Sequence, residues 1–286
     1  MPSNLQCLLL QESDIELSTF PKRGSGHKDN FTMMQSVVSE ARRQRDSLKR
    51  RFPGLTETSM DLIISASTEY NPDFPTPYFF NWLRDQNDKL QFDCALIELE
   101  KIRDWYFDPG QNLRHSSGKF FSIEGIQIKV SSESGTKEWN QPIINQPEIG
   151  ILGIICQNHS GILYFLMQAK MEPGNVNKAQ LSPTLQATRS NFTQVHKGKK
   201  PPYLEYFQSL NGKKIIVDQL QSEQGARFLK KRNRNMIIEI NPDEKIELLA
   251  NYCWLTLGQL KALLEKDNIV NMDARTVLSC TQLNRE

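Results

Sequence analysis

The stretch "IGILGIICQNHSGILYFLMQAKM" (149–171) decides the fold of this chain. Two apolar runs flank the polar turn "NHSG" at 158–161, and each run is long enough for a strand but far too short to cross a bilayer. This pattern predicts two antiparallel strands joined by a tight connection. Since the runs are apolar along most of their length, we expect the hairpin to lie in the protein core.

Further strands are predicted on both sides of this hairpin. The segment "KFFSIEGIQIKV" (119–130) alternates apolar and polar residues, with Gly125 expected at a bulge. The segments "KIIVDQLQ" (214–221) and "NMIIEI" (235–240) read as two more strands. Strands in series that are flanked by helices indicate an α+β fold and not a doubly wound one.

Helices are predicted near both ends of the chain. One begins at Phe31, with Asp29 or Asn30 as its cap, and ends before Pro53. A second spans "TLGQLKALLEKDN" (256–268). In this second helix Thr256 is the expected cap and the inner face comprises Leu257, Leu260, Leu263 and Leu264.

A proline-broken aromatic segment, "YNPDFPTPYFF" (70–80), marks a boundary. We therefore expect an N-terminal helical extension over residues 1–70 and one α+β domain over residues 71–286. The basic run at 42–51 is either an anion-binding patch or the solvated face of the first helix, and charge runs usually have the second meaning.

Composition excludes several classes of protein. The chain has 286 residues, and 35 Lys and Arg against 33 Asp and Glu leave a formal charge of +2, so neither a nucleic-acid partner nor a membrane surface is expected. No signal peptide is predicted from "MPSNLQCLLLQESDIEL". The five cysteines are scattered and form no CxxC pair, which favours reduced thiols in a cytoplasmic protein over a disulfide framework or a zinc site. No dinucleotide-binding, phosphate-loop or GxSxG motif occurs.

The second strand of the hairpin ends in polar residues. Alternation places Gln168 and Lys170 on one side, with Glu172 next in the same row. This row is either the wall of a pocket or a structural ion pair at a strand end. Beyond it, residues 173–191 are rich in amides and hydroxyls, and the basic segment "EQGARFLKKRNRNM" (223–236) either holds a diphosphate or is solvated.

The order of several segments is more specific than any one of them. These segments are "RHSSGKFFSIEGIQI" (114–128), "WNQPIINQPEIGILG" (139–153), "LMQAKMEPGNVNKAQLSPTLQATRSNFTQVH" (166–196), "PPYLEYF" (201–207), "EQGARFLKKRNRNM" (223–236) and "WLTLGQLKALLEKDNIVNMDARTVL" (254–278). Together they resemble the NDP-hexose 2,3-dehydratases of deoxysugar biosynthesis, from about Asn81 to Leu278. The resemblance implies a Nudix-like α+β fold, yet the chain lacks the Glu-rich REUxEExGU helix of Nudix hydrolysis. Family members usually carry two copies of this domain; one is visible here, and we expect a homodimer.

The resemblance also implies a substrate and a reaction. The substrate is a dTDP-linked 4-keto-6-deoxyhexose, from which a base removes the C3 proton, the C2 hydroxyl leaves, and a 3,4-diketo sugar forms. This elimination requires no redox cofactor or metal, so none is expected. Two alternatives remain: a non-catalytic sugar-nucleotide-binding module, and a Nudix-type pyrophosphohydrolase.

Candidate residues can be named for each role. Glu172 or His115 is the C3 base, and Lys170 or Tyr203 donates a hydrogen bond to the C4 oxygen or to the departing hydroxyl. The substrate-binding candidates are Gln168, Asn175, Gln180, Thr188, Arg189, Asn191 and Glu205, with Arg232 and Arg234 for the diphosphate.

Overall fold

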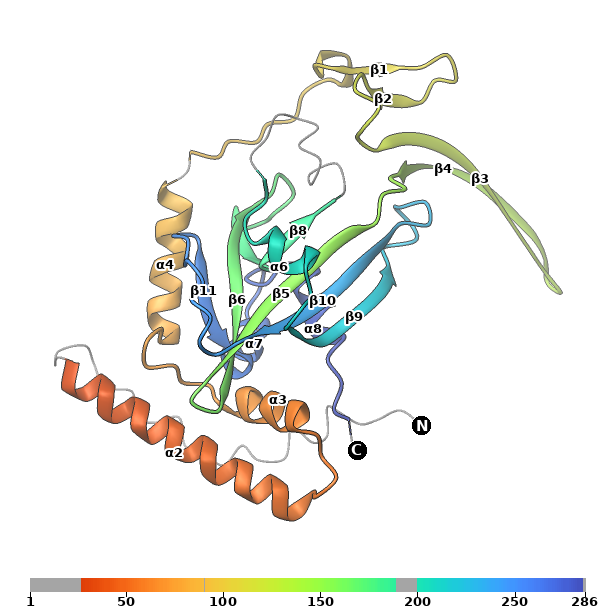
Figure 1. The fold of residues 1–286 in the computed structure, drawn as a ribbon. Coiled ribbons are helices and arrows are strands. Elements are labelled where there is room, and N and C mark those ends of the chain that lie inside the picture. The colour runs from red at the N-terminus through yellow and green to blue at the C-terminus, as the bar shows by residue number, and fades with distance from the viewer. Residues whose placement is uncertain (1–26, 90, 189–199, 285–286) are drawn as a thin grey trace.

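The computed structural model describes residues 27–89, 91–188 and 200–284 (Figure 1). Its helices are α2 (His27–Arg51), α3 (Glu57–Ser67), α4 (Thr76–Lys89), the short 3-10 helix η1 (Leu99–Lys101), α6 (Leu204–Gln208), α7 (Leu257–Leu264) and α8 (Met272–Ser279). Its strands are β1 (Trp105–Phe107), β2 (Leu113–His115), β3 (Ser122–Ser132), β4 (Gly135–Asn145), β5 (Gly150–His159), β6 (Ile162–Met171), β7 (Ala179–Ser182), β8 (Leu185–Ala187), β9 (Lys214–Ser222), β10 (Arg232–Ile240) and β11 (Tyr252–Thr256).

The predicted central hairpin is confirmed as β5 and β6. The two strands are antiparallel, and Ser160 and Gly161 form the turn with φ values of 55° and 90°. The larger sheet has the order β11-β6-β5-β10-β9, in which β10 runs parallel to β5 and the other neighbours are antiparallel. A mixed sheet with helices packed against it confirms the predicted α+β class.

The hairpin strands separate at one end of the sheet. They pair with each other only as far as Ile155 and Leu166. Beyond that point β6 pairs with β7 and β5 pairs with β8. We call this region, filled by β7 and β8, the fork. Because β7 and β8 complete the ladders, the polar end of β6 is held within the sheet and not left at a free edge.

Helices cover the two faces of the large sheet unequally. One face packs against α4, α7 and α8 in a cluster that includes Leu83, Leu152, Phe165 and Val277. The other face packs against α6 through Phe207. In Figure 1, α4 lies alongside β11, while α3 and α2 lie across the end that carries the β5–β6 turn. The fork is at the opposite end.

The N-terminal helices are joined to the sheet by specific bonds. The Ser65 hydroxyl donates to the backbone oxygen of Leu163 at 2.5 Å and accepts from the backbone N–H of Leu257 at 2.9 Å. Helix α2 begins at His27, four residues before the predicted start at Phe31. The division of the chain at residue 70 stays a prediction. In the basic run of α2, Arg43, Arg45 and Lys49 form ion pairs, as where Arg45 contacts Glu57 at 2.6 Å.

Helix α7 begins at the predicted residue but ends earlier than predicted. The predicted cap at Thr256 is confirmed as a capping box with Gln259. Leu260 and Leu263 are buried as expected, but Leu264 is 40% exposed. The helix ends at Leu264, so the last residue of the apolar stripe turns out of the core.

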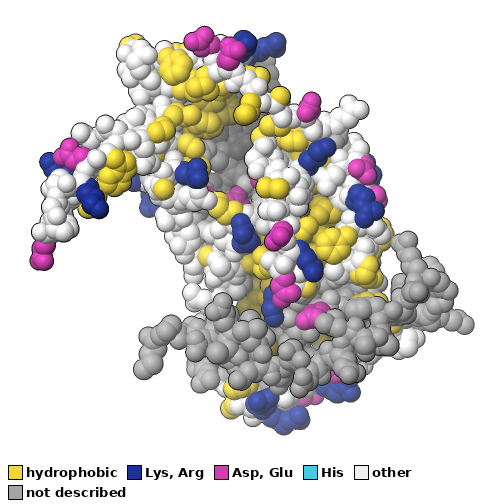
Figure 2. Space-filling view, turned by 180° about the vertical axis from the view of Figure 1, so that it is seen from behind, with side chains coloured by type: hydrophobic (Ala, Val, Ile, Leu, Met, Phe, Trp, Pro, Cys, Tyr) yellow, Lys and Arg dark blue, Asp and Glu magenta, His cyan; other side chains and the backbone are white. Residues whose placement is uncertain are grey.

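A smaller sheet, in the order β1-β2-β3-β4, carries a long β3–β4 arm. The predicted bulge at Gly125 is wrong, because the β3–β4 ladder is continuous and Gly125 lies opposite Pro142. Figure 2 shows this arm standing clear of the body. The exposed large hydrophobic residues of the small sheet include Tyr106, Phe107 and Trp139. Among the described residues, no helix is long and apolar enough to cross a membrane.

Candidate active site

Three polar side chains meet in the fork. The Lys170 ammonium lies 3.1 Å from Oε1 of Glu172 and donates to Oε1 of Gln186 at 2.8 Å. The Gln186 amide nitrogen in turn donates to Oε1 of Glu172 at 3.2 Å. Lys170 and Glu172 therefore do form the ion pair that their spacing allowed. Their side chains remain 28% and 31% exposed, so both are accessible to a ligand.

Helix α8 adds a second carboxylate to this cluster. Asp273 lies in its first turn, and one of its carboxylate oxygens accepts a hydrogen bond from the Gln186 amide nitrogen. The helix is held in place by Asn271, whose side chain accepts from the backbone N–H of Ala274 at 2.8 Å. Asn271 also donates to the Ser182 hydroxyl at 3.3 Å, and Ser182 donates to Gln186 at 2.8 Å. The helix terminus and the fork are thus one hydrogen-bonded unit.

The environment of Asp273 favours its neutral form. Burial is the largest cause, and repulsion from Glu223 and Glu172 adds to it. Attraction to Lys170 and the hydrogen bond from Gln186 act in the opposite direction. The net effect raises the pKa of Asp273 from 3.8 to about 6. Asp273 therefore titrates close to neutrality, which is where a group that exchanges protons with a substrate is most effective.

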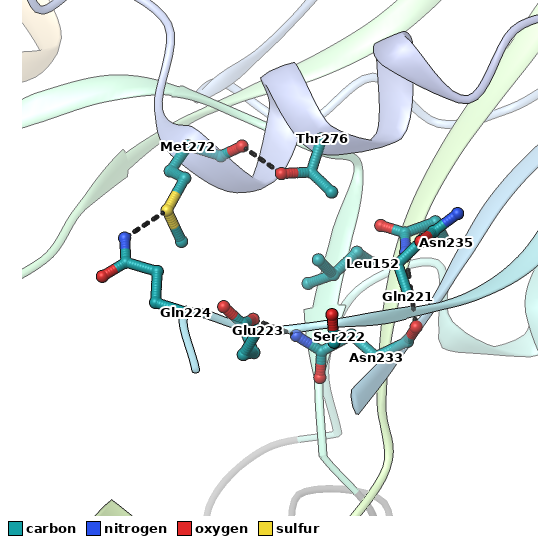
Figure 3. A pocket seen from close by; sticks show the side chains of 9 residues that line it. All are labelled: Leu152, Gln221, Ser222, Glu223, Gln224, Asn233, Asn235, Met272 and Thr276. Atoms are coloured by element: carbon teal, nitrogen blue, oxygen red, sulfur yellow. Dashed lines mark hydrogen bonds between the residues drawn. The ribbon is translucent and has the colours of Figure 1, made fainter. Parts of the chain in front are cut away.

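A cavity of about 120 Å³, with both polar and apolar side chains in its lining, adjoins the cluster (Figure 3). It lies between α8 and the ends of β9 and β10, and its lining residues are Leu152, Gln221, Ser222, Glu223, Gln224, Asn233, Asn235, Met272 and Thr276. Two relationships connect it to the cluster: Leu152 lies opposite Gln186 in the β5–β8 ladder, and Met272 directly precedes Asp273.

One cavity-lining side chain has an unsatisfied polar atom. Asn235 is fully buried, and its side-chain oxygen has no hydrogen-bond partner in the described part of the chain. Its amide nitrogen donates to the backbone oxygens of Asn233 at 3.3 Å and Gln219 at 3.5 Å. An unpaired buried acceptor is costly, so its presence beside a cavity indicates a site for a hydrogen-bond donor.

Several predicted site residues lie near the cluster. Gln180 is buried and lies opposite Lys170 in the β6–β7 ladder, and Gln168 lies opposite Ser182. Asn175 has a structural task, because its amide nitrogen donates to the backbone oxygens of Lys170 at 3.2 Å and Lys178 at 2.9 Å. Its side chain shapes the turn that follows β6.

Tyr203 and Glu205 lie apart from the cluster. Tyr203 is only 6% exposed, and its hydroxyl donates to the backbone oxygen of Glu247 at 2.7 Å and accepts from the N–H of Leu249 at 3.2 Å. Burial raises the pKa of Tyr203, and its hydroxyl is already committed to these backbone groups. Glu205 is exposed and pairs with Lys200 at 3.1 Å.

His115 belongs to the smaller sheet. Its Nδ1 accepts from the backbone N–H of Ser117 at 3.1 Å, and its ring packs on Phe120 with centroids 4.4 Å apart and on Trp105 at 5.3 Å. The structure therefore does not bring His115 together with Lys170 and Glu172, the two other residues predicted to act on the sugar.

The arginines of β10 face away from the cavity. Asn233 and Asn235 line it, so alternation along the strand puts Arg232 and Arg234 on the opposite face. Arg234 makes two contacts of 2.6 Å with the Asp218 carboxylate, whereas Arg232 is exposed. Their diphosphate role stays a prediction. Thr188 follows directly after β8 and is partly buried, and Arg189 and Asn191 lie outside the described residues.

Sequence reasoning missed three residues of the site. Gln186 was one polar residue among many in the amide-rich stretch, and Asp273 sits in an ordinary helix-start pattern after Asn271. Asn235 is the first residue of the apolar segment "NMIIEI", and nothing in that pattern indicates a binding role. Within the part of the chain that the structure describes, no group of three or more His, Cys, Asp or Glu side chains is placed to hold a metal ion.

Comparisons with known proteins agree with the resemblance noted above. The model of the family described as NDP-hexose 2,3-dehydratase matches residues 76–281. A protein of Saccharopolyspora spinosa named dTDP-4-dehydro-6-deoxy-alpha-D-glucopyranose 2,3-dehydratase is 51% identical over 76% of this chain and 44% of its own length. A protein of Amycolatopsis orientalis with the same name is 44% identical over 77% of this chain and 47% of its own.

The chain spans less than half the length of these relatives. Among solved structures, the Ap4A hydrolase of C. elegans aligns with 42% of this chain and 89% of its own, at 13% identity and a TM-score of 0.27, which is too low to support a statement about a shared fold. The family match covers most of the chain and includes the whole cluster of Lys170, Glu172, Gln186 and Asp273. This chain belongs to the NDP-hexose 2,3-dehydratase family.

Proposed function

We propose that this chain removes the C2 hydroxyl of a dTDP-linked 4-keto-6-deoxyhexose and yields a 3,4-diketo sugar. The observation that carries the proposal is the pairing of an ammonium with a carboxylate, Lys170 with Glu172 at 3.1 Å, at the polar end of a core strand beside a cavity. The relatives named above are called 2,3-dehydratases of the corresponding dTDP-sugar.

Glu172 is the better candidate for the C3 base. It shares the fork with Lys170, so one residue can take the proton while the other donates to the C4 oxygen, where negative charge develops. The described contacts of His115 in the smaller sheet include no ammonium or guanidinium group that could stabilise the C4 oxygen. Proton removal leaves an enolate across C3 and C4, and Lys170 stabilises its oxygen.

Elimination then completes the step. The enolate electrons form the C2–C3 double bond and the C2–O bond breaks. The hydroxyl leaves as water after it gains one proton, and the resulting enol tautomerises to the diketone. One molecule of substrate gives one molecule of product and one of water, so the balance needs no oxidant or reductant.

The test is elimination by the purified chain. Incubation with dTDP-4-keto-6-deoxyglucose should give a product lighter by one water, which a diamine that condenses with vicinal diketones would trap for mass spectrometry. Glu172→Gln should lower turnover by ~10²–10⁴-fold, as expected for removal of a general base. His115→Asn should leave turnover close to that of the unsubstituted chain.

A matched control is Glu138→Gln on the exposed β3–β4 arm, which should not change turnover. A chain that binds the dTDP-sugar in calorimetry but eliminates no water would be a sugar-nucleotide-binding module instead. If elimination proceeds and only His115→Asn abolishes it, Glu172 is not the base. The expected homodimer is also a proposal, because two-fold assembly is the commonest among soluble oligomers, and light scattering of the purified chain tests it.

A further inference from the structure

The Gln186 side chain links two carboxylates in a fixed arrangement. Its nitrogen donates to Glu172 and to Asp273, while its oxygen accepts from Lys170 and from Ser182. All the hydrogen-bonding positions of the amide are used, so its orientation is determined by the network. Each carboxylate has one oxygen bonded to the amide nitrogen, and its other oxygen has no hydrogen bond within the described part of the chain.

The two carboxylates have different electrostatic surroundings. Glu172 contacts the Lys170 ammonium directly at 3.1 Å. Asp273 contacts no cation among the residues that the structure describes. Glu172 at the end of β6 and Glu223 after β9 both repel its charge, while Lys170 and Gln186 reduce the effect only in part. A site in which one carboxylate is paired with an ammonium while a second is repelled by two other carboxylates offers distinct groups for a base and an acid.

Asn235 independently indicates that a ligand enters beside Asp273. Its side-chain oxygen is buried and has no partner among the described residues, and Asn235 lines the same cavity as Met272, the neighbour of Asp273. A neutral hydroxyl would satisfy this acceptor, and the other polar lining groups are three amides, two hydroxyls and one carboxylate. This set suits a polyhydroxylated ring.

Resting on the proposed function, we propose that Asp273 is the general acid that protonates the departing C2 hydroxyl, with Glu172 as the base on the same amide. Glu172 takes the C3 proton, the enolate expels the C2 oxygen, and Asp273 transfers its proton to that oxygen to release water. The enol proton on the C3 oxygen then returns to Asp273, and the proton held by Glu172 moves to C2. Both carboxyl groups end in the state in which they began.

The test separates acid from base by two readouts. Asp273→Asn keeps an acceptor for the Gln186 amide but has no acidic proton, so elimination from dTDP-4-keto-6-deoxyglucose should fall by ~10²–10⁴-fold. In heavy water the same variant should still incorporate deuterium at C3 of recovered substrate, because the base is intact. Glu172→Gln should lose both the exchange and the elimination.

A second substrate tests the same proposal without relying on the variant. Fluoride leaves without protonation, so a substrate with fluorine in place of the C2 hydroxyl should be turned over by Asp273→Asn at nearly the rate of the unsubstituted chain. With the hydroxyl substrate, turnover by the unsubstituted chain should decline as pH rises above the range in which the acid is protonated. With the fluoro substrate this decline should be absent.

The outcomes distinguish this inference from the proposed function. If the unsubstituted chain eliminates no water, the proposed function fails. If it does, and Asp273→Asn retains turnover within about fivefold or loses equal factors on both substrates, Asp273 is not the acid. Asp267→Asn, an exposed residue in the loop before α8, is the matched control and should behave as the unsubstituted chain. Should Asp273→Asn fail to fold, the pH profiles on the two substrates decide, and identical declines overturn the inference.

Discussion

The Thr184 hydroxyl donates a hydrogen bond to the backbone oxygen of Leu166 at the point where β5 and β6 separate. The same hydroxyl accepts from the backbone N–H of Ile155 at 2.9 Å. One side chain thus replaces the ladder bonds that the two strands lose, and both backbone groups are buried. The fork, and with it the polar cluster, depends on this replacement.

Thr184→Val should destabilise the protein, because valine matches the shape of threonine but leaves the N–H of Ile155 and the oxygen of Leu166 unpaired. Each unsatisfied buried group costs about 1–3 kcal/mol, so the free energy of unfolding should fall by roughly 2–6 kcal/mol. Urea unfolding followed by circular dichroism measures this change. Thr136→Val, on the exposed arm, is the control and should change it by less than about 0.5 kcal/mol. Equal midpoints for the two variants would contradict the role of Thr184.

Asp273→Asn should change the pH dependence of stability. The pKa of Asp273 is higher in the folded chain, about 6, than its ordinary 3.8, so the folded state binds the proton more tightly. Wild-type stability therefore falls as pH rises from about 4 to 6 and stays lowered above that range. The pKa difference limits this fall in the free energy of unfolding to about 3 kcal/mol. Solvent near the half-buried side chain reduces the fall to roughly 1–2 kcal/mol.

Asparagine does not titrate, so the free energy of unfolding of Asp273→Asn should not fall between pH 4 and 6. The variant should therefore be more stable than the unsubstituted chain at pH 7, and the difference should vanish near pH 4. Thermal melts at several pH values measure it. A constant difference across that range would show that Asp273 does not titrate in the window given by its raised pKa.

Gly258→Ala should loosen the contact between α3 and α7. A Cβ atom at this position would lie 2.5 Å from the backbone oxygen of Thr68, and a backbone atom cannot move aside as a side chain does. Overpacking of this kind costs about 1–3 kcal/mol. Gly125→Ala is the matched control, since a Cβ there meets nothing within 4 Å. If both variants melt at the same temperature, α3 is not held tightly against the domain.

Asn235→Leu should weaken substrate binding more than it slows chemistry. Loss of one neutral hydrogen bond is worth about 0.5–1.5 kcal/mol, so KM should rise by roughly 2–12-fold with little change in kcat. Steady-state kinetics with dTDP-4-keto-6-deoxyglucose measure both. A variant with unchanged KM would show that no substrate group pairs with the Asn235 oxygen.

The sequence by itself determined the local features of this protein. The alternation of 161–171 placed Lys170 and Glu172 in one row, and the pair is present at 3.1 Å. The apolar runs around the turn defined the central hairpin, and Thr256 defined the start of α7. These features depend on side-chain periodicity and on capping within one or two turns, so neighbouring residues are sufficient to specify them.

Only the tertiary structure decided which distant residues share the site. Gln186 and Asp273 are 87 positions apart, and they meet because β8 pairs with β5 in one register while Asn271 fixes where α8 begins. Pairing also turned Arg234 away from the cavity, since shifting a strand by one residue exchanges its two faces. Register and helix placement are set by long-range packing, which no local pattern contains, and for that physical reason only the folded chain showed that Asp273 joins the cluster.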